Sequence, residues 1–294
     1  MKKWALVLSG GGGRGIAYAG VFKALEKLDL HPDMLVGCSI GAVMGGIYAS
    51  GVSAGELEDF ILHTFELKFY LESVTYRLGD GAFFRFLQAQ EALSSLVGSR
   101  GVASGRRIHR ALLELTRGRT FEQSRPRFLC NAVDLLTGRE VVMDSGLLAD
   151  GIRPSMSVPG LFAPVERNGM LLADGGILNN LPVWIPRERG IRRVIAVNCS
   201  PFTPISPDEI PNGITVFFRA LAAASHDRGI VPERDIPDLE IVLPARSSEF
   251  DFGRKREQIA MGEEKILENA DLIHRVLSRG GPRSFFRAPR PLKA

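Results

Sequence analysis

Cysteine is scarce in this sequence. Its 294 residues include three cysteines, Cys38, Cys130 and Cys199, which lie far apart and never form a C-x-x-C pair. An odd number at such spacings argues against a disulfide framework and against a zinc site. The cysteine usage therefore predicts a reducing compartment, and we expect the cytoplasm.

Long apolar runs and charge of one sign are also missing. No stretch approaches the roughly 18 uninterrupted apolar residues of a membrane span, so any membrane contact is expected to be peripheral. The apolar run Trp4–Leu8 is shorter than the roughly 7–15 residues of a signal-peptide core and is interpreted as a buried strand. The 37 basic and 33 acidic residues leave a net charge of +4. Nucleic acid is therefore not an expected partner, whereas a mildly basic surface suits anionic lipid.

Hydrophobic residues make up 45% of the chain, which is enough to bury a substantial core. The same order of segments occurs twice near the start of the chain: an apolar run, then glycine, then a helical pattern. The apolar runs are Trp4–Leu8 and 34–36, and the helices that follow are predicted at 16–28 and Ile40–Ala49. Continuous apolar runs of this kind are typical of parallel strands covered on both faces.

Strand and helix patterns continue to alternate along the rest of the chain. Ser53 and Glu56 have the spacing of a capping box that opens a helix through about residue 65. Further strands are predicted at 128–133 and 140–143, which form a hairpin, and at 170–173, 194–197 and 239–243, with helices at 214–225 and 257–277. This alternation predicts an α/β fold with a largely parallel central sheet.

Two segments have a composition of their own. Residues 66–105 are rich in aromatics and glycines, and either core helices or a cap over a pocket would account for them. Residues 281–294 are basic and interleaved with prolines, which predicts a flexible tail. We therefore expect one domain over residues 1–280 followed by this tail.

The glycine run from Gly10 to Gly15, interrupted only by Arg14, lies between a strand and a helix. Its unobstructed N–H groups favour an anion or a developing oxyanion. The run also fits G-x-G-x-x-G, but Asp33 precedes the second strand, whereas a dinucleotide site needs its acidic residue at the strand end. No lysine with serine or threonine follows, which excludes a P-loop.

The second strand ends in Gly37-Cys38-Ser39-Ile40-Gly41, a G-x-S-x-G pattern. Its glycines permit a sharp strand-to-helix turn that exposes the serine hydroxyl at a helix N-terminus. An ordinary glycine turn would match the same three positions. The position of the pattern at the end of a predicted strand favours a nucleophile.

A base for this serine is not evident among the histidines. None of the five lies in a distinctive sequence context; they are His31, His63, His109, His226 and His274. Asp174 ends an apolar strand and is followed by two glycines, as expected of a side chain presented at a strand end. Asp-Gly-Gly is also an ordinary turn sequence, and the combination with Ser39 favours a catalytic role.

These pieces, in this order, resemble the patatin-like phospholipase family and imply a patatin-like serine acyl hydrolase of the bacterial type. The resemblance rests on S-G-G-G-G-R-G, on G-C-S-I-G, on the block R-P-S-M-S-V-P-G at 153–160 and on D-G-G-I-L-N-N-L-P-V from Asp174. It implies a three-layer α/β/α fold and a catalytic dyad of Ser39 and Asp174. It also implies an oxyanion hole from the amides of Gly11 and Gly12, with Arg14 holding the loop.

The resemblance further implies a lipid or other fatty-acyl ester as substrate, with no metal or organic cofactor. Cys38, Ile40 and Pro154 depart from residues that are usual in the family, which bears on acyl-chain preference. Two alternatives stand beside this hypothesis. One is a nucleotide-binding oxidoreductase that uses the glycine loop, and the other is a non-catalytic lipid-binding or interaction protein on the same fold.

Overall fold

The computed structural model describes residues 3–65, 98, 100, 101, 103–210, 213–226, 232–244 and 252–278. Most of the aromatic-rich segment 66–105 and all of the tail 281–294 lie outside these residues. The predictions made for those segments, and the division at residue 280, stay predictions.

In the described part of the chain, eight strands form one sheet in the order β5-β6-β3-β2-β1-β7-β8, with β4 also paired to β3. The strands are β1 (Trp4–Leu8), β2 (Met34–Gly37), β3 (Arg127–Asp134), β4 (Arg139–Met143), β5 (Val165–Arg167), β6 (Met170–Asp174), β7 (Arg193–Asn198) and β8 (Leu239–Val242). β3, β2, β1, β7 and β8 are parallel neighbours, whereas β4, β5 and β6 are joined by antiparallel pairs. The predicted α/β fold with a largely parallel sheet is confirmed.

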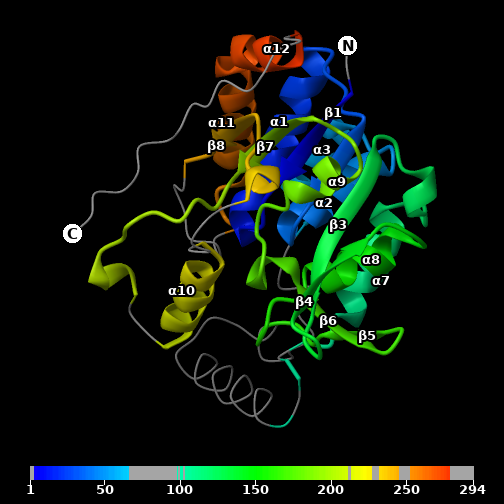
Figure 1. Cartoon of the computed structure of the whole chain (residues 1–294), viewed down its shortest axis with the longest axis vertical. Helices are drawn as coiled ribbons and strands as arrows, with labels where there is room; N and C mark the ends of the chain where they lie inside the picture. The colour runs from blue at the N-terminus through cyan, green and yellow to red at the C-terminus, as the bar shows by residue number, and fades with distance from the viewer. Residues whose placement is uncertain are drawn as a thin grey trace.

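Helices cover both faces of the sheet (Figure 1). They are α1 (Ala17–Lys27), α2 (Ile40–Ala49), α3 (Ala54–His63), α7 (Arg106–Leu115), α8 (Leu148–Ser155), α9 (Trp184–Glu188), α10 (Gly213–His226), α11 (Lys255–Glu268) and α12 (Ala270–Ser278). Successive residues of β1 alternate between two buried clusters, as the pleat of a strand requires. Trp4 and Leu6 pack in the cluster with α1, α2, α3 and α11, and Ala5 and Val7 pack with Val183 and the start of α9. The three layers are therefore as expected.

Three local features differ from the predictions. The first helix opens as a 3-10 turn, η1 (Gly12–Ile16), before α1 begins. The predicted C-terminal helix is two helices, α11 and α12, separated at Asn269. α8 was not predicted separately, and Pro154 lies in its last turn.

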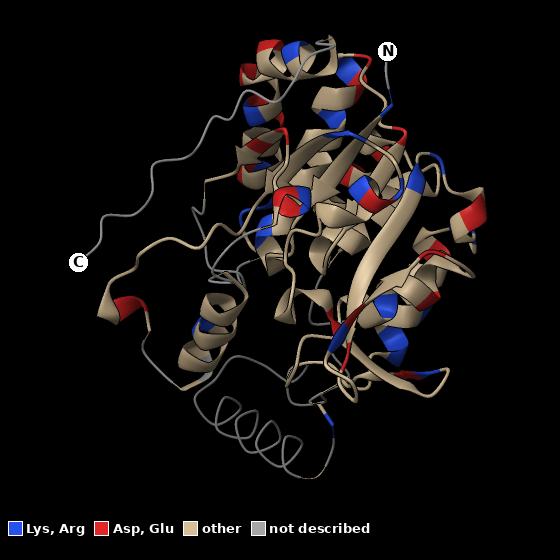
Figure 2. Cartoon of the chain, in the orientation of Figure 1, with Lys and Arg blue, Asp and Glu red and all other residues tan. Residues whose placement is uncertain are grey.

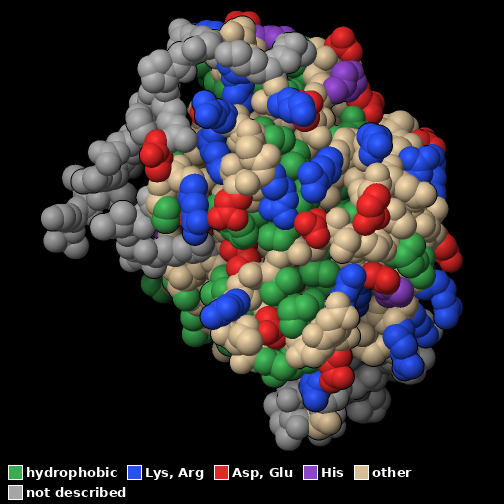
Figure 3. Space-filling view, turned by 45° about the vertical axis from the view of Figure 1, so that its right-hand side comes forward, with side chains coloured by type: hydrophobic (Ala, Val, Ile, Leu, Met, Phe, Trp, Pro, Cys, Tyr) green, Lys and Arg blue, Asp and Glu red, His purple; other side chains and the backbone are tan. Residues whose placement is uncertain are grey.

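Charged residues are concentrated on the helices and loops around a central sheet that is almost free of charge (Figure 2). On the face seen in Figure 3, basic and acidic side chains are intermixed around small apolar areas. The excess of positive charge is therefore not gathered on that face. Among the described helices, none combines the length and the apolar character needed to cross a membrane.

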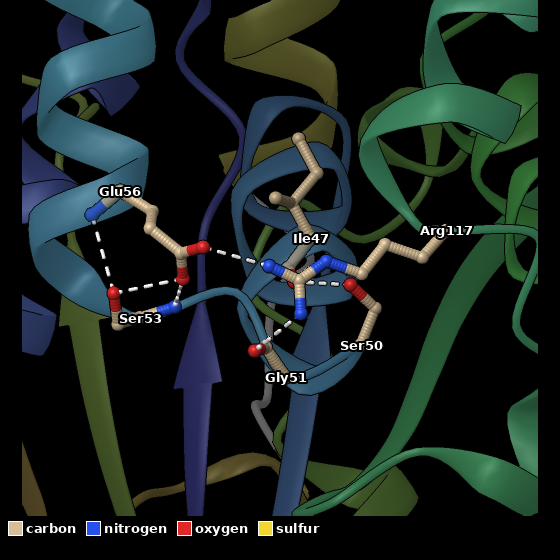
Figure 4. A network of polar contacts seen from close by, with 6 residues as sticks. All are labelled: Ile47, Ser50, Gly51, Ser53, Glu56 and Arg117. Carbon is tan, nitrogen blue, oxygen red and sulfur yellow. Dashed lines mark hydrogen bonds and ion pairs between the residues drawn. The ribbon is translucent and has the colours of Figure 1, made fainter.

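A polar network joins the end of α2 to the starts and ends of its neighbours (Figure 4). The predicted capping box at the start of α3 is present, since Ser53 and Glu56 exchange hydrogen bonds through their side chains and amides. Arg117, just after α7, donates to Glu56 at 2.7 Å and to the carbonyl of Gly51 at 3.2 Å. These bonds fix the turn after α2, the helix that begins at the nucleophile candidate Ser39.

Close packing of α1 against α11 depends on two glycines. A methyl group on Gly20 would collide with the carbonyl oxygen of Ile259, and one on Gly262 with that of Ala17. Backbone atoms cannot move aside without separating the helices. We expect Gly20→Ala and Gly262→Ala each to lower the free energy of unfolding by about 2 kcal/mol or more, measured by urea denaturation.

Gly55 provides the control for this prediction, because it lies on α3 with no atom near the place of an added methyl group. Gly55→Ala should be neutral or slightly stabilising, since alanine favours helix more than glycine does. Equal destabilisation by all three substitutions would contradict the close-packing argument.

Candidate active site

β2 and β6 meet end to end along one edge of β3. β3 pairs in parallel with β2 along its first half and antiparallel with β6 along its second half, while β4 pairs with that second half as well. Because β4 occupies one edge, β2 and β6 share the other and run toward each other. β2 ends with Gly37 opposite Cys130, and β6 ends with Asp174 opposite Ala132. Ser39, which follows Gly37 closely, is thereby brought to the end of β6.

Ser39 lies at a sharp turn between β2 and α2. Its φ of 52° and ψ of −121° are unusual for a residue with a side chain, and such backbone strain is typical of functional turns. The turn has no space for side chains at its flanks, because a methyl group on Gly37 would collide with Gly41 and one on Gly41 would approach the carbonyl oxygens of Leu8 and Ser9. The result is a partly exposed serine at the N-cap of a helix.

Asp174 is buried at the end of β6, with 5% of its surface exposed. Its Oδ1 accepts a hydrogen bond from the Gly176 amide at 2.8 Å and a long one from the Cys38 thiol at 3.9 Å. Burial raises the pKa of this carboxyl group to about 6, against the lowering effect of hydrogen bonds from Ser39, Gly176 and Cys38. The group is therefore an unusually strong base for a carboxylate.

The contact between the Ser39 hydroxyl and Asp174 is close but not a well-aligned hydrogen bond. The hydroxyl lies near enough to lower the pKa of the carboxyl group, yet Oδ2 of Asp174 has no partner at normal hydrogen-bond geometry. A strong hydrogen bond requires alignment as well as proximity. Loose contacts of this kind are common between catalytic groups before a substrate binds.

The glycine loop lies directly beside Ser39. The position of an added methyl group on Gly10 is 3.0 Å from the Cβ atom of Ser39. Gly11 is the N-cap of η1 and Gly12 its first residue, with φ values of 156° and 56°. The first N–H groups of a helix have no partner within it, so these two amides are available to an anion at the loop.

Arg14 holds the loop from the side of β7. Its amide donates to the carbonyl of Gly11 at 3.2 Å, and its guanidinium donates to the Ser200 hydroxyl at 3.4 Å. The structure therefore brings Ser39, Asp174 and the glycine loop together, and it places the Arg14 side chain beside Ser200. The roles assigned to these residues stay predictions.

Asn180 is a site residue that the sequence reasoning missed. Its carbonyl accepts from the Gly10 amide at 3.2 Å, and its side-chain amide donates to the Gly10 carbonyl at 3.4 Å. Asn180 thus ties the glycine loop to the segment that follows Asp174. Its place in D-G-G-I-L-N-N, six residues after Asp174, is the only signal that the sequence offers.

The block at residues 153–160 accepts hydrogen bonds from the backbone of Ser39 and Asp174, a role that the sequence did not predict. Ser155 accepts a hydrogen bond from the amide of Ser39 at 3.2 Å, and the carbonyl of Ser157 accepts one from the amide of Asp174 at 3.0 Å. Arg153, 5% exposed, donates to the Ser157 hydroxyl and to carbonyl groups of nearby loops. The end of α8 and the segment directly after it therefore position both members of the candidate dyad.

Asp33, the acidic residue considered for a dinucleotide site, lies at the opposite end of the strands from the glycine loop. Its carboxylate accepts from the amide of Trp4 at 2.9 Å, at the start of β1, whereas the glycine loop follows the end of that strand. A ribose held at the loop would not reach this carboxylate. The structure gives no support to the dinucleotide alternative.

Similarity to known proteins covers most of this chain. The "Patatin-like phospholipase" family matches residues 6–187. The chain is 30% identical over 254 residues to lysophospholipase NTE1 of Debaryomyces hansenii, covering 85% of this chain and 15% of that protein. It is 28% identical over 220 residues to lysophospholipase NTE1 of Saccharomyces cerevisiae, covering 72% and 12%. This chain therefore spans about a seventh of the length of such relatives.

Among solved structures, VipD from Legionella pneumophila superposes with a TM-score of 0.50 at 14% sequence identity. The match covers 92% of this chain and 67% of VipD. At this identity the similarity concerns the fold alone.

Burial of an ionisable group at Asp174 has a consequence for stability. Its folded-state pKa of about 6 exceeds the ordinary value of 3.8, so ionisation destabilises the folded state as pH rises between these values. We expect Asp174→Asn to raise the free energy of unfolding at about pH 8 by up to about 3 kcal/mol. The gain should shrink toward about pH 4, as measured by urea denaturation at both pH values.

Asp134 provides a control of opposite sign. Hydrogen bonds, first from Thr137 and then from the amide of Leu171, hold the pKa of this carboxyl group below its ordinary value, so its charge stabilises the fold above that value. Asp134→Asn should therefore be destabilising at about pH 8. A loss of stability in both variants would show that the charge of Asp174 does not destabilise the folded state.

Proposed function

Because this chain belongs to the patatin-like phospholipase family, we propose that it is a serine hydrolase that cleaves fatty-acyl ester bonds of lipids. The observation that supports this most directly is the meeting of a strained, accessible serine with a buried carboxylate. Ser39 would be the nucleophile and Asp174 its base, in a dyad without histidine. The activity would require no metal and no organic cofactor.

The reaction we propose has two halves. In the first, Oγ of Ser39 bonds to the ester carbonyl carbon while its proton passes to Asp174, and the tetrahedral species then expels the alcohol, which takes that proton. In the second, a water molecule attacks the acyl carbon and gives a proton to Asp174. The bond between Oγ and the acyl carbon breaks, the fatty acid leaves, and the proton returns to Ser39.

Two features of the site would lower the barrier. Burial makes Asp174 a stronger base than an exposed carboxylate. The difference between its pKa and that of the weakly acidic serine hydroxyl is therefore smaller. The amides of Gly11 and Gly12 are suited to stabilise the tetrahedral oxyanion, with Arg14 and Asn180 holding the loop that carries them. Loss of one oxyanion-hole donor typically costs about 2.7–4 kcal/mol, so the loop would matter as much as the dyad.

Lysophospholipids are the first substrates to test. The relatives at 28–30% identity carry the name lysophospholipase, which favours a single-chain phospholipid over other fatty-acyl esters. Because this chain spans a small part of those relatives, diacyl phospholipids and neutral lipids belong in the same assay. We place the activity in the cytoplasm, with peripheral contact to the lipid surface.

Covalent labelling tests the nucleophile. We expect a fluorophosphonate probe to label the protein and Ser39→Ala to abolish both labelling and ester hydrolysis, with a loss of about a thousandfold or more in kcat. Ser278→Ala provides the control and should be labelled and hydrolyse esters like the parent, because this serine lies at the end of α12 and donates to the carbonyl of His274 on its own helix. Hydrolysis at the parent rate by Ser39→Ala would refute the assignment.

If the protein binds lipid but neither reacts with the probe nor hydrolyses any ester, the non-catalytic alternative holds instead. This outcome separates the two hypotheses, since probe reactivity requires an activated serine and not merely a bound lipid.

The pH profile tests the base. Asp174 must be ionised to accept the proton, so kcat should rise through about pH 6. The Cys38 thiol donates to this carboxylate and lowers its pKa. We therefore expect Cys38→Ala to move the rising limb to higher pH. A limb that stays in place in this variant would argue against Asp174 as the base, and a limb near pH 4 in the parent would show that burial does not raise its pKa.

A further inference from the structure

α10 presents an apolar face to water. Apart from the terminal His226, its exposed residues lie at positions 213, 216, 217, 220 and 224, which recur at helical spacing and form one stripe. They are Gly213, Val216, Phe217, Ala220 and Ala224, and Val216 and Phe217 are 53% and 48% exposed. A surface helix normally turns its charged residues to solvent and its apolar stripe to the core. In α10 the exposed stripe is wholly apolar, and Figure 2 shows the helix almost entirely tan.

Contacts that flank this stripe support the orientation of α10. Arg219, the only lysine or arginine of the helix, donates to the carbonyl of Thr203 at 2.6 Å and lies 3.6 Å over the ring of Phe202. His226 at the end of the helix stacks on the same ring at 4.9 Å. These contacts draw the cation away from the outer stripe, so the apolar face is the one that remains outside.

α10 lies beside the candidate active site. It packs against η3 (Gly175–Ile177), the turn that directly follows Asp174, and it stands apart from the sheet in Figure 1. A second exposed apolar element belongs to the same region. Leu135 and Leu136 follow the end of β3 and are 46% and 65% exposed, and the amide of Leu135 bonds to Leu171 of β6 at 2.8 Å.

The exposed apolar side chains are thus unevenly distributed. Within the described residues six large hydrophobic side chains are exposed, and four of them lie on these two elements; the six are Leu135, Leu136, Val216, Phe217, Val242 and Leu267. Both elements adjoin the strand and turn that carry Asp174. Grouped exposed apolar residues mark an interaction surface, whereas scattered ones do not.

We propose that the outer stripe of α10, together with the Leu135–Leu136 tip, docks this protein on the surface of a lipid aggregate. The inference rests on the proposed function, because it supplies the route by which a fatty-acyl ester reaches Ser39. The occupant is a lipid surface because the stripe has neither charged groups nor side-chain hydrogen-bonding groups to pair with a protein. Without any acidic residue, α10 also does not repel anionic headgroups.

The carboxylate next to the Leu135–Leu136 tip is buried. Asp134 precedes the Leu135–Leu136 tip, but it is 3% exposed and its carboxylate accepts from Leu136, Leu171 and the Thr137 hydroxyl. The tip can therefore enter a lipid interface without desolvating an exposed carboxylate at its base.

Vesicle binding tests this surface independently of catalysis. The Ser39→Ala protein is mixed with vesicles of phosphatidylcholine and phosphatidylglycerol in equal parts and separated by flotation. We expect it to bind, and expect Val216→Ser with Phe217→Ser to weaken the partition about tenfold or more. Leu136→Ser should weaken it less. Phe217→Leu should bind like Ser39→Ala alone, which would exclude a simple loss of the helix.

Leu267→Ser on α11 is the matched control, because it removes an apolar side chain that is 41% exposed and lies outside the two elements. Equal weakening by Leu267→Ser, absence of vesicle binding by the Ser39→Ala protein, or unchanged binding of the α10 variants would each overturn the proposal. A concentration-dependent dimer that disappears in the α10 variants, without an effect on vesicle binding, would also overturn it in favour of a second copy as occupant.

Activity on two substrates separates this proposal from the proposed function. In the active protein, the α10 substitutions should slow hydrolysis of lysophosphatidylcholine in vesicles about tenfold and leave hydrolysis of monomeric p-nitrophenyl butyrate within about twofold. If the parent binds vesicles through α10 but cleaves neither ester, the docking surface stands and the proposed function fails. If the α10 variants slow both substrates alike, α10 acts on the site itself and the docking proposal fails.

Discussion

The meeting of β2 and β6 on one edge of β3 is the constraint on which the candidate site depends. A parallel strand usually has one neighbour along each edge, but here β2 stops halfway along β3 and β6 takes its place from the opposite direction. Two chain segments that are distant in sequence therefore end at the same point. Ser39 and Asp174 are close because two strand registers against β3 are fixed, and not because a flexible loop carries one to the other.

This arrangement makes the site rigid at the cost of burying a charge. The carboxylate of Asp174 lies where β6 ends inside the molecule, so burial raises its pKa and its ionised form weakens the fold. The surrounding hydrogen bonds offset part of that effect, and they come from the residues that also define the serine turn, Cys38 and Ser39, and from Gly176. A stronger base and a less stable fold thus have one cause, a trade-off that is common at functional sites.

Much of this architecture could be predicted from the sequence, for local reasons. The runs Trp4–Leu8 and 34–36 are continuously apolar because both faces of the sheet are covered, and the glycines after them are required by turns that leave no space for side chains. Strands, turns and the order of the motifs are properties of short segments. The pairing of the two helices α1 and α11, by contrast, depends on Gly20 and Gly262, and nothing local distinguishes these from glycines of ordinary helices.

The residues that hold the site in place were also not predicted, because they act through contacts with distant segments. Ser155, Ser157 and Asn180 act through single hydrogen bonds to backbone groups of distant segments, and a hydroxyl or an amide in a sequence does not reveal its partner. α8 was also not predicted separately, and it is held by bonds of Arg153 to a distant loop and by packing against β3. Interactions that span the fold decide these positions.

The face that α10 exposes is likewise decided by contacts with another segment and not by the helix sequence alone. Its sequence, apolar with one arginine, predicts a helix but not which side turns inward, since every face carries apolar residues. The contacts of Arg219 and His226 with Phe202 decide the orientation. They hold Arg219, which is half-buried, against Phe202 and leave Val216 and Phe217 in water beside the turn that follows Asp174. Turning this stripe toward the core would bury its apolar side chains and stabilise the fold. Its exposure is therefore explained by the docking on lipid that brings a substrate to the site.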